Sequence, residues 1–252
     1  VGDAIRDRRN SVEICTKAGM RWDRSDGQHF FNTTHPATDE PVKIYRILKG
    51  DAVIEECERS LKRLGVDTID LYQCHWPDDT TPLGETMEAM IRLREQGKIR
   101  EIGVSNFTPD MIGECLETAP IVCDQPRYSP LFREIEDDIL PYVQERNVSL
   151  IVYNPLEMGL LTGTVTMERT FPDTDQRSRQ HSFQPENRRK VLDALDKLSH
   201  IRENHDATTT QVIVNWVKDE PGITAAIVGG RSIDQVRENA ASADFVLTTE
   251  ER

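Results

Sequence analysis

Side chains that can do chemistry recur in this sequence directly after short apolar runs. Lysine and histidine can transfer protons or hydrogen-bond a reacting oxygen. Backbone N–H groups at the start of a helix, joined by a guanidinium, favour an anion such as a phosphate. Each residue alone could simply end a strand or form a turn, so their common position carries the argument. The set comprises Lys17, His75, Ser105, Asn106, Gln125, Tyr153, Asn154 and the sequence Gly229-Gly230-Arg231.

Alternating strand-like and helix-like segments position these residues. Val53, Cys57, Leu61 and Leu64 share one helical stripe, and Thr108-Pro109 is typical of a helix cap and first turn. Short apolar strands are predicted at 11–17, 68–75, 100–105, 120–125, 148–155 and 223–230. Helices are predicted at 51–65, 82–97, from 109, at 134–147 with Pro141 as a kink or break, and at 187–204, 208–219 and 232–242. Residues 20–46 and 164–187 are expected to be loops.

The alternation predicts an α/β fold with a parallel sheet, either a barrel or a doubly wound sheet. In a (β/α)8 TIM barrel the carboxyl ends of all strands meet at one rim, where the active site is built. A doubly wound sheet gathers ligands mainly at one switch point, and no G-x-G-x-x-G follows the first strand. The sequence therefore favours the barrel, as a single domain over residues 1–252.

Composition and charge argue against several classes of protein. The net charge of −13 disfavours nucleic acid as a partner. No apolar run approaches the roughly 18 residues of a membrane helix, and no signal pattern begins at Val1. The five cysteines lack C-x-x-C spacing and the six histidines lack metal spacing, so neither a disulfide framework nor a metal site is expected. Cys15, Cys57 and Cys74 are expected in the core of a cytoplasmic protein.

Six segments resemble the aldo-keto reductase family, in the family's order and over nearly the whole chain. They are "VEICTK", "IDLYQCHWPD", "QGKIREIGVSNF", "CDQPRYSPL", "IVYNPLEMGLLTG" and "AAIVGGRSIDQVRENA". The pattern is more similar to the bacterial and potassium-channel β-subunit branch than to the mammalian aldose reductase branch. The resemblance implies a TIM barrel that binds NADPH without a Rossmann domain. It also implies reduction of an aldehyde or ketone to an alcohol.

The resemblance implies catalytic roles for Lys17 and His75. The family uses an aspartate, a tyrosine, a lysine and a histidine, and the last two match these positions. A lysine about 4 Å from the tyrosine hydroxyl, at an effective dielectric of about 20, stabilises the phenolate by roughly 4 kcal/mol. That lowers the tyrosine pKa by about three units and suits it to proton transfer. His75 would direct an N–H at the substrate carbonyl, and Trp76 and Trp22 would line an apolar substrate mouth.

The family's aspartate and tyrosine lie in a D-x-x-x-x-Y-G segment that the resemblance places before Val1. We therefore expect that the first two strands of the barrel are missing from this chain and that the proton donor lies upstream. Tyr72 is no substitute, since strand alternation should point it away from the face of Gln73 and His75. Tyr45 falls in an expected loop and cannot be placed from the sequence.

The resemblance further implies residues that bind NADPH. Ser105, Asn106 and Gln125 would hydrogen-bond the nicotinamide carboxamide, although Asp124 stands where the family usually has asparagine. Tyr153 would stack on the nicotinamide ring. The other expected cofactor residues are Asn154, Leu156, Gly159 and Gly163 near the pyrophosphate, and Gly229, Gly230, Arg231, Gln235, Glu238 and Asn239 near the adenosine. A guanidinium at Arg231 suits a 2′-phosphate, so NADPH is expected over NADH.

Two other functions fit parts of the sequence. A cofactor-binding sensor or interaction subunit could use the same barrel without catalysis. A D-x-x-x-x-Y motif upstream would supply the catalytic aspartate and tyrosine and would argue against this non-catalytic function. A sugar-processing barrel needs paired carboxylates, but only Asp78 and Asp124 stand at strand ends. The leading hypothesis is a reductase of a small-molecule carbonyl substrate. The sequence predicts neither the identity of that substrate nor the oligomeric state.

Overall fold

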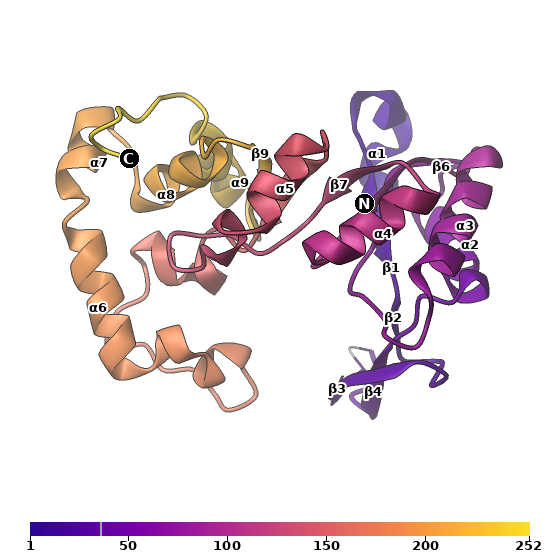
Figure 1. Ribbon diagram of the computed structural model, residues 1–252. Coiled ribbons are helices and arrows are strands. Elements are labelled where there is room, and N and C mark those ends of the chain that lie inside the picture. Colours follow the sequence, from indigo (N-terminus) through magenta and orange to yellow (C-terminus); the bar gives the residue numbers. More distant parts are fainter. Residues whose placement is uncertain (36) are drawn as a thin grey trace. The chain divides into compact units, whose positions relative to one another are not determined.

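The computed structural model describes residues 1–35 and 37–252. The chain forms two compact units, and Figure 1 shows the helices and strands of both as ribbons. Unit 1 contains residues 1–126 and 138–149, and unit 2 contains residues 127–137 and 150–252. The expectation of one domain over residues 1–252 stays a prediction. None of the helices in the described ranges is both long and apolar enough to cross a membrane.

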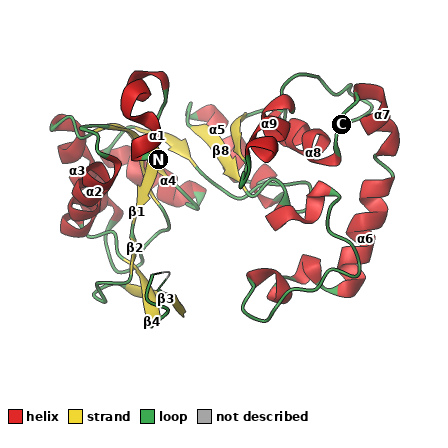
Figure 2. Ribbon diagram, turned by 180° about the vertical axis from the view of Figure 1, so that it is seen from behind, coloured by secondary structure: helices red, strands yellow, loops and turns green. Residues whose placement is uncertain are grey.

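Unit 1 is built on four parallel strands with helices packed against them (Figure 2). The strand order is β1 (Cys15–Ala18), β5 (Ile69–Cys74), β6 (Ile99–Val104) and β7 (Ile121–Asp124). The helices are α1 (Gly2–Ile5), α2 (Gly50–Leu64), α3 (Leu83–Glu95), α4 (Pro109–Thr118) and α5 (Ile139–Glu145). Gly65 ends α2 in a left-handed conformation, and Thr108 caps α4 by accepting from Met111 N. These helix ends lie where the sequence predicts them.

The two faces of this sheet carry different side chains. Tyr72 points toward the helices, where its hydroxyl donates to the carbonyl oxygen of Val53 at 3.3 Å. Register partners on neighbouring parallel strands share a face, and one row of partners crosses all four strands: Lys17, Gln73, Gly103 and Cys123. This row lies on the face opposite Tyr72, so the predicted orientation of Tyr72 is confirmed. Cys15 is exposed, so the expectation that it fills the core is wrong.

Residues 20–46 are not a loop, contrary to the expectation. They form an antiparallel sheet in the order β2 (Met20–Arg21), β4 (Pro41–Arg46) and β3 (Gln28–Thr34). Most side chains of β3 are exposed, so the alternation that reveals a half-buried strand is absent. Tyr45 lies on β4 and packs edge-on against His29, with ring centroids 5.5 Å apart.

The predicted helix at 134–147 is broken. Glu134–Glu136 form a 3-10 turn, and α5 then starts at Ile139. The N–H of Ile139 donates a hydrogen bond to the side chain of Asp138. Pro141 is therefore the third residue of a new helix, where its missing N–H removes no helical hydrogen bond. The break allows Pro141 to remain helical.

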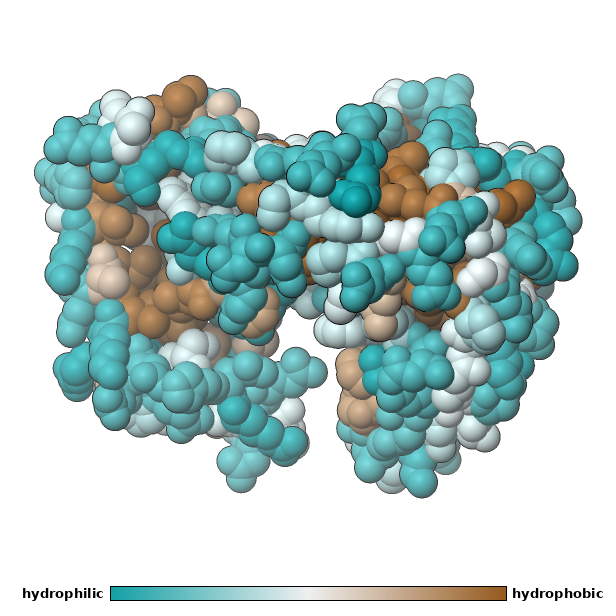
Figure 3. Space-filling view, viewed as in Figure 1, coloured by the Kyte–Doolittle hydropathy of each residue, from teal (hydrophilic) through white to brown (hydrophobic). Residues whose placement is uncertain are grey.

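Unit 2 contains β8 (Ser149–Tyr153) from its second residue on, paired in parallel with β9 (Ile223–Ile227). Its helices are α6 (Pro185–Asp196), α7 (Ser199–His205), α8 (Thr209–Lys218) and α9 (Ile233–Ala241). The predicted helix at 187–204 is two helices, because the N–H groups of Lys197 and Leu198 bond three residues back and tighten the turn. Leu160, Leu161, Phe183 and others form an apolar cluster with α6, and Figure 3 shows hydrophobic residues beside that helix.

Candidate active site

Lys17 and His75 lie at the carboxyl ends of neighbouring strands in unit 1. The backbone N–H of His75 donates to the carbonyl oxygen of Ala18 at 2.9 Å, which ties the end of β5 to that of β1. Burial, followed by the charge of Lys17, lowers the pKa of His75 to about 4. Burial also lowers the pKa of Lys17, while the neighbouring thiols of Cys15 and Cys123 act in the opposite direction. The imidazole is therefore neutral near pH 7 and can donate one N–H.

Ser105, Asn106 and Gln125 form one hydrogen-bonded group beside His75. The Ser105 hydroxyl donates to the backbone oxygen of Gln125 at 2.7 Å. The Asn106 amide donates to the Ser105 hydroxyl at 3.0 Å and to the backbone oxygen of His75 at 3.1 Å. Asn106 has φ 64°, a left-handed conformation that asparagine tolerates better than most residues. The structure thus brings these three predicted residues together with His75.

Gln73 belongs to the same group, although the sequence assigned it no function. Its side chain is fully buried and accepts a hydrogen bond from the Gln125 amide at 3.1 Å. Its own amide donates to the backbone oxygen of Val104 at 3.1 Å. Gly103 makes room for it, because a Cβ there would lie 3.0 Å from Cγ of Gln73. The only signal in the sequence is a polar amide inside an otherwise apolar strand.

The two tryptophans expected at the substrate mouth have different surroundings. Trp76 is partly buried and packs on Phe30, with ring centroids 5.4 Å apart. Trp22 is 55% exposed and lies edge-on to His35, with centroids 6.0 Å apart. Trp76 is therefore part of an aromatic surface next to His75, whereas Trp22 belongs to a separate pair.

The two carboxylates at strand ends do not form a catalytic pair. Asp78 is a structural cap whose oxygens accept from Leu48 N, Thr80 and Thr81. Asp124 pairs with Val104 in register, which places it on the helical face of the sheet, opposite Lys17. Burial raises the pKa of Asp124 to about 8. The arrangement gives no support to a sugar-processing mechanism.

In unit 2, the segment after β8 turns sharply. Asn154 has φ 62°, and its side-chain oxygen accepts from Met158 N at 2.9 Å. Gly159 and Gly163 have φ 94° and 77°, which favour glycine. No atom lies within 4 Å of the position that a Cβ on Gly159 would take, so the backbone is open to a ligand there. The partly buried Tyr153 and Leu156 lie in the same segment.

A buried ion pair that the sequence did not predict supports this segment. Glu157 is 1% exposed and forms an ion pair with Arg127, and the Ser129 hydroxyl donates to Glu157 at 2.7 Å. Glu157 also has a positive φ of 46°. The only hint in the sequence is an acidic residue between Leu156 and Met158, in a run that is otherwise apolar or small.

The turn before α9 uses several of the predicted cofactor residues to hold its own shape. The Arg231 N–H donates to the side chain of Gln235 at 2.8 Å, and the Asn239 amide donates to the Gly229 oxygen at 3.1 Å. Glu238 accepts from the Thr208 hydroxyl at 2.7 Å. The Arg231 side chain is exposed; the pKa of Asp175 is lowered chiefly by its hydrogen bonds to Arg177 and, to a smaller extent, by the charge of Arg231. The space beside Gly229 is open, since no atom lies within 4 Å of where its Cβ would be, whereas a Cβ on Gly230 would meet Val236.

The family model for the aldo/keto reductase family matches residues 1–252. The chain belongs to this family. Among curated proteins it is 33% identical to Aldo-keto reductase YhdN of Bacillus subtilis (strain 168), over 100% of this chain and 72% of that protein. It is also 33% identical to the NADH-specific methylglyoxal reductase of Escherichia coli (strain K12), over 98% of this chain and 74% of that protein.

A solved structure supports the same assignment. The glycerol dehydrogenase AKR11B4 from Gluconobacter oxydans matches with a TM-score of 0.89 and 36% identity, over 100% of this chain and 73% of that one. The predicted α/β fold of the TIM-barrel class is confirmed, and so is the predicted family. This aldo/keto reductase is therefore an oxidoreductase that acts on carbonyl compounds with a nicotinamide cofactor.

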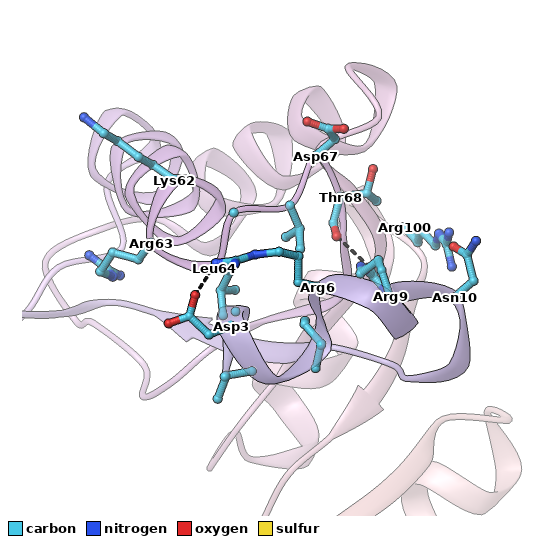
Figure 4. A pocket seen from close by; sticks show the side chains of 15 residues that line it. Asp3, Arg6, Arg9, Asn10, Lys62, Arg63, Leu64, Asp67, Thr68 and Arg100 are labelled. Carbon is cyan, nitrogen blue, oxygen red and sulfur yellow. Dashed lines mark hydrogen bonds and ion pairs between the residues drawn. The ribbon is translucent and has the colours of Figure 1, made fainter.

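The reductase has a separate pocket at the opposite strand ends of unit 1. It has a volume of about 580 Å³, and its basic side chains come from the 3-10 turn Arg6–Ser11, from α2 and from β6 (Figure 4). Arg9 and Arg100 both bond Asp70, at 2.7 and 2.6 Å. These charges hold strand starts together, and residues at this end of a barrel usually serve stability. Within residues 1–35 and 37–252, no cluster of three or more His, Cys, Asp or Glu could hold a metal.

Proposed function

We propose that this aldo/keto reductase reduces a small aldehyde or ketone to an alcohol and prefers NADPH. The observation that carries the proposal is the grouping of Lys17, a neutral His75, the Ser105 hydroxyl and the amides of Asn106 and Gln125 at one edge of unit 1. NADPH, when bound, would supply the hydride, and the family's tyrosine would supply the proton that completes the alcohol. The residues of the chain then have to hold the carbonyl oxygen and stabilise its developing charge.

Lys17 and His75 have complementary roles in this proposal. His75 is neutral near pH 7 and donates an N–H toward the carbonyl oxygen without adding a second charge beside the ammonium. Lys17 keeps the role that the resemblance implies: its positive charge stabilises the phenolate of the proton-donating tyrosine, and partial burial strengthens that interaction. Trp76, which is partly buried and packs on Phe30, would limit the access of water beside His75.

Each unit, taken by itself, offers groups whose chemistry suits one part of the cofactor. Gln125 is 3% exposed, and no donor among the described residues reaches its Oε1. That acceptor suits the carboxamide N–H of nicotinamide. In unit 2, the open space beside Gly159 and Gly229 suits phosphate oxygens that approach the backbone. In unit 1, Ser105 and Asn106 would orient the carboxamide; in unit 2, Tyr153 offers an aromatic face of the kind that packs on a nicotinamide ring.

The preference for NADPH depends on Arg231. Family membership does not decide it, because one relative is named for NADH specificity. The Arg231 side chain is exposed, and its turn is held by Gln235 and Asn239, so the guanidinium can meet a 2′-phosphate. The names of two relatives, for methylglyoxal and glycerol, favour a small substrate.

Nucleotide binding tests the cofactor preference. We expect Arg231→Ala to weaken NADPH binding about 10- to 100-fold, because a charge-assisted contact is lost, and to leave NADH nearly unchanged. Arg237→Ala is the matched control, since Arg237 is exposed on the helix that follows this turn. Dissociation constants come from the fluorescence of the bound nucleotide. Equal losses for both nucleotides would refute the role of Arg231.

Turnover tests the reaction. We expect NADPH oxidation with methylglyoxal as substrate, and a fall in kcat of about 100-fold or more for Lys17→Met. Lys43→Met, an exposed lysine on β4, should leave kcat unchanged. Binding of NADPH without turnover of any aldehyde would instead support the second candidate, a cofactor-binding subunit without catalysis.

A further inference from the structure

Arg46 is a partly buried cation that lacks a polar partner among the described residues. It is the last residue of β4, and its Nε atom is buried without a hydrogen bond. No ion pair connects its guanidinium to any carboxylate of the described chain, although acidic residues outnumber basic ones by 44 to 31. Within residues 1–35 and 37–252, the guanidinium lies over the ring of Phe30, whose centroid is 4.9 Å from Cζ. Burial of an unsatisfied charged donor is costly, which favours a ligand at this position.

Arg46 lies close to the catalytic strand ends. The guanidinium of Arg46 lies over the ring of Phe30. Phe30 also packs on Trp76, the residue that follows His75. The residue after Arg46, Ile47, donates its N–H to the Gly19 oxygen at 3.0 Å, just beyond β1. The Ala18 oxygen beside it accepts from His75 N at 2.9 Å. Arg46, Phe30 and Trp76 therefore form a continuous surface that leads to His75.

The chemistry of the surface indicates what kind of ligand it binds. Gln28 is the register partner of Arg46, and its Oε1 is likewise buried without a partner. A neutral hydroxyl could bond both atoms but would leave the guanidinium charge uncompensated, whereas a carboxylate compensates the charge and leaves Oε1 of Gln28, an acceptor, without a donor. A carboxylate matches the planar guanidinium with two parallel hydrogen bonds and also neutralises its charge. The charge therefore decides in favour of a carboxylate.

We infer that Arg46 binds a carboxylate on the substrate and selects for anionic carbonyl compounds. The inference rests on the proposed function for the identity of the reacting group, but not for the anion site itself. Phe30 and Trp76 cover the apolar part of the substrate between the carboxylate and the carbonyl. Arg46 is a specificity-determining residue, since it acts away from the reacting atoms.

A pair of substrates that differ only in charge tests the inference. We compare 4-carboxybenzaldehyde with its neutral methyl ester, methyl 4-formylbenzoate. Arg46→Met should lower kcat/KM for the acid about 10- to 100-fold, mainly through KM, and change that for the ester by less than about twofold. Lys43→Met removes a charge from the same strand and should change neither value. Equal losses for acid and ester would overturn the inference.

Two further measurements separate failure of the inference from failure of the proposed function. Binding of benzoate, followed by tryptophan fluorescence, requires no turnover. If neither these aldehydes nor methylglyoxal is reduced, the proposed function fails, whereas benzoate binding that is lost in Arg46→Met and kept in Lys43→Met still supports the inference. Benzoate binding that does not depend on Arg46 overturns it. If Arg46→Met does not fold, Arg46→Lys replaces it, with the same selective rise in KM for the acid expected.

Discussion

The side-chain amide of Gln125 donates to Oε1 of Gln73 at 3.1 Å, and both residues are almost inaccessible to solvent. Gln73 is oriented in turn by its hydrogen bond to the Val104 oxygen. This chain links the ends of β5, β6 and β7. It fixes which atom of Gln125 is left to accept a hydrogen bond from a cofactor. Gln73 is thus a positioning residue, because it acts through Gln125.

Replacement of Gln73 by leucine tests this relationship. Gln73→Leu keeps the size of the side chain but leaves the buried Gln125 amide without its acceptor, which should cost about 1–3 kcal/mol in free energy of unfolding. It should also weaken NADPH binding, because Gln125 is free to turn. Urea unfolding and nucleotide fluorescence measure the two effects. Gln96→Leu, an exposed control at the end of α3, should change neither. Unaltered NADPH affinity in Gln73→Leu would contradict the positioning role.

Asp124 should make stability fall as pH rises from about 4 to about 8. Burial raises the pKa of its carboxyl from 3.8 to about 8, so between these values the folded state holds a proton that the unfolded state has lost. Stability from this group is therefore full below about pH 4 and is lost as pH rises through 8. Asp124→Asn removes the ionisation, and its free energy of unfolding should exceed that of wild type more at pH 9 than at pH 5. Asp110→Asn, at an exposed site on α4, is the control. If the free energies of unfolding of Asp124→Asn and wild type differed by the same amount at every pH, the carboxyl of Asp124 would not be protonated in the folded state.

His75 should lower stability at acidic pH. Its folded-state pKa of about 4 lies below the ordinary value of 6.5, so between them only the unfolded state binds the proton. Acidification from pH 6.5 to 4 therefore favours unfolding, and His75→Gln should show a weaker dependence over that window. The titration of the His75 ring by NMR measures the pKa directly. A midpoint near 6.5 would mean that the ring is neither buried nor close to a charged Lys17.

The ion pair of Arg127 with Glu157 should stabilise the turn after β8. Arg127→Met leaves a carboxylate that is 1% exposed without its cation, and we expect a loss of about 3 kcal/mol in free energy of unfolding. The double variant Arg127→Met/Glu157→Gln should recover most of that loss, since the uncompensated charge is gone. Arg133→Met breaks a pair whose arginine is 54% exposed and should cost less than about 1 kcal/mol. Similar losses for Arg127→Met and Arg133→Met would show that burial of Glu157 is unimportant.

Much of the fold follows from local patterns. The stripe of Val53, Cys57 and Leu61 predicts α2, Gly65 predicts its end, and the apolar run 69–74 predicts β5. Residues 20–46 could not be predicted in this way, because β3 is held by backbone pairing to β4 while its side chains stay exposed. A strand without a buried face leaves no periodic signal.

The sequence by itself determined the family, the order of the elements and the position of Lys17, His75, Ser105 and Gln125 at strand ends. These features depend on short motifs and on periodicity, which neighbouring residues define. Only the tertiary structure decided which side chains meet: Gln73 with Gln125, Arg127 with Glu157, and Arg46 with Phe30 but with no carboxylate among the described residues. Such pairs join segments up to 52 residues apart, so they depend on strand register and packing, which no local pattern encodes.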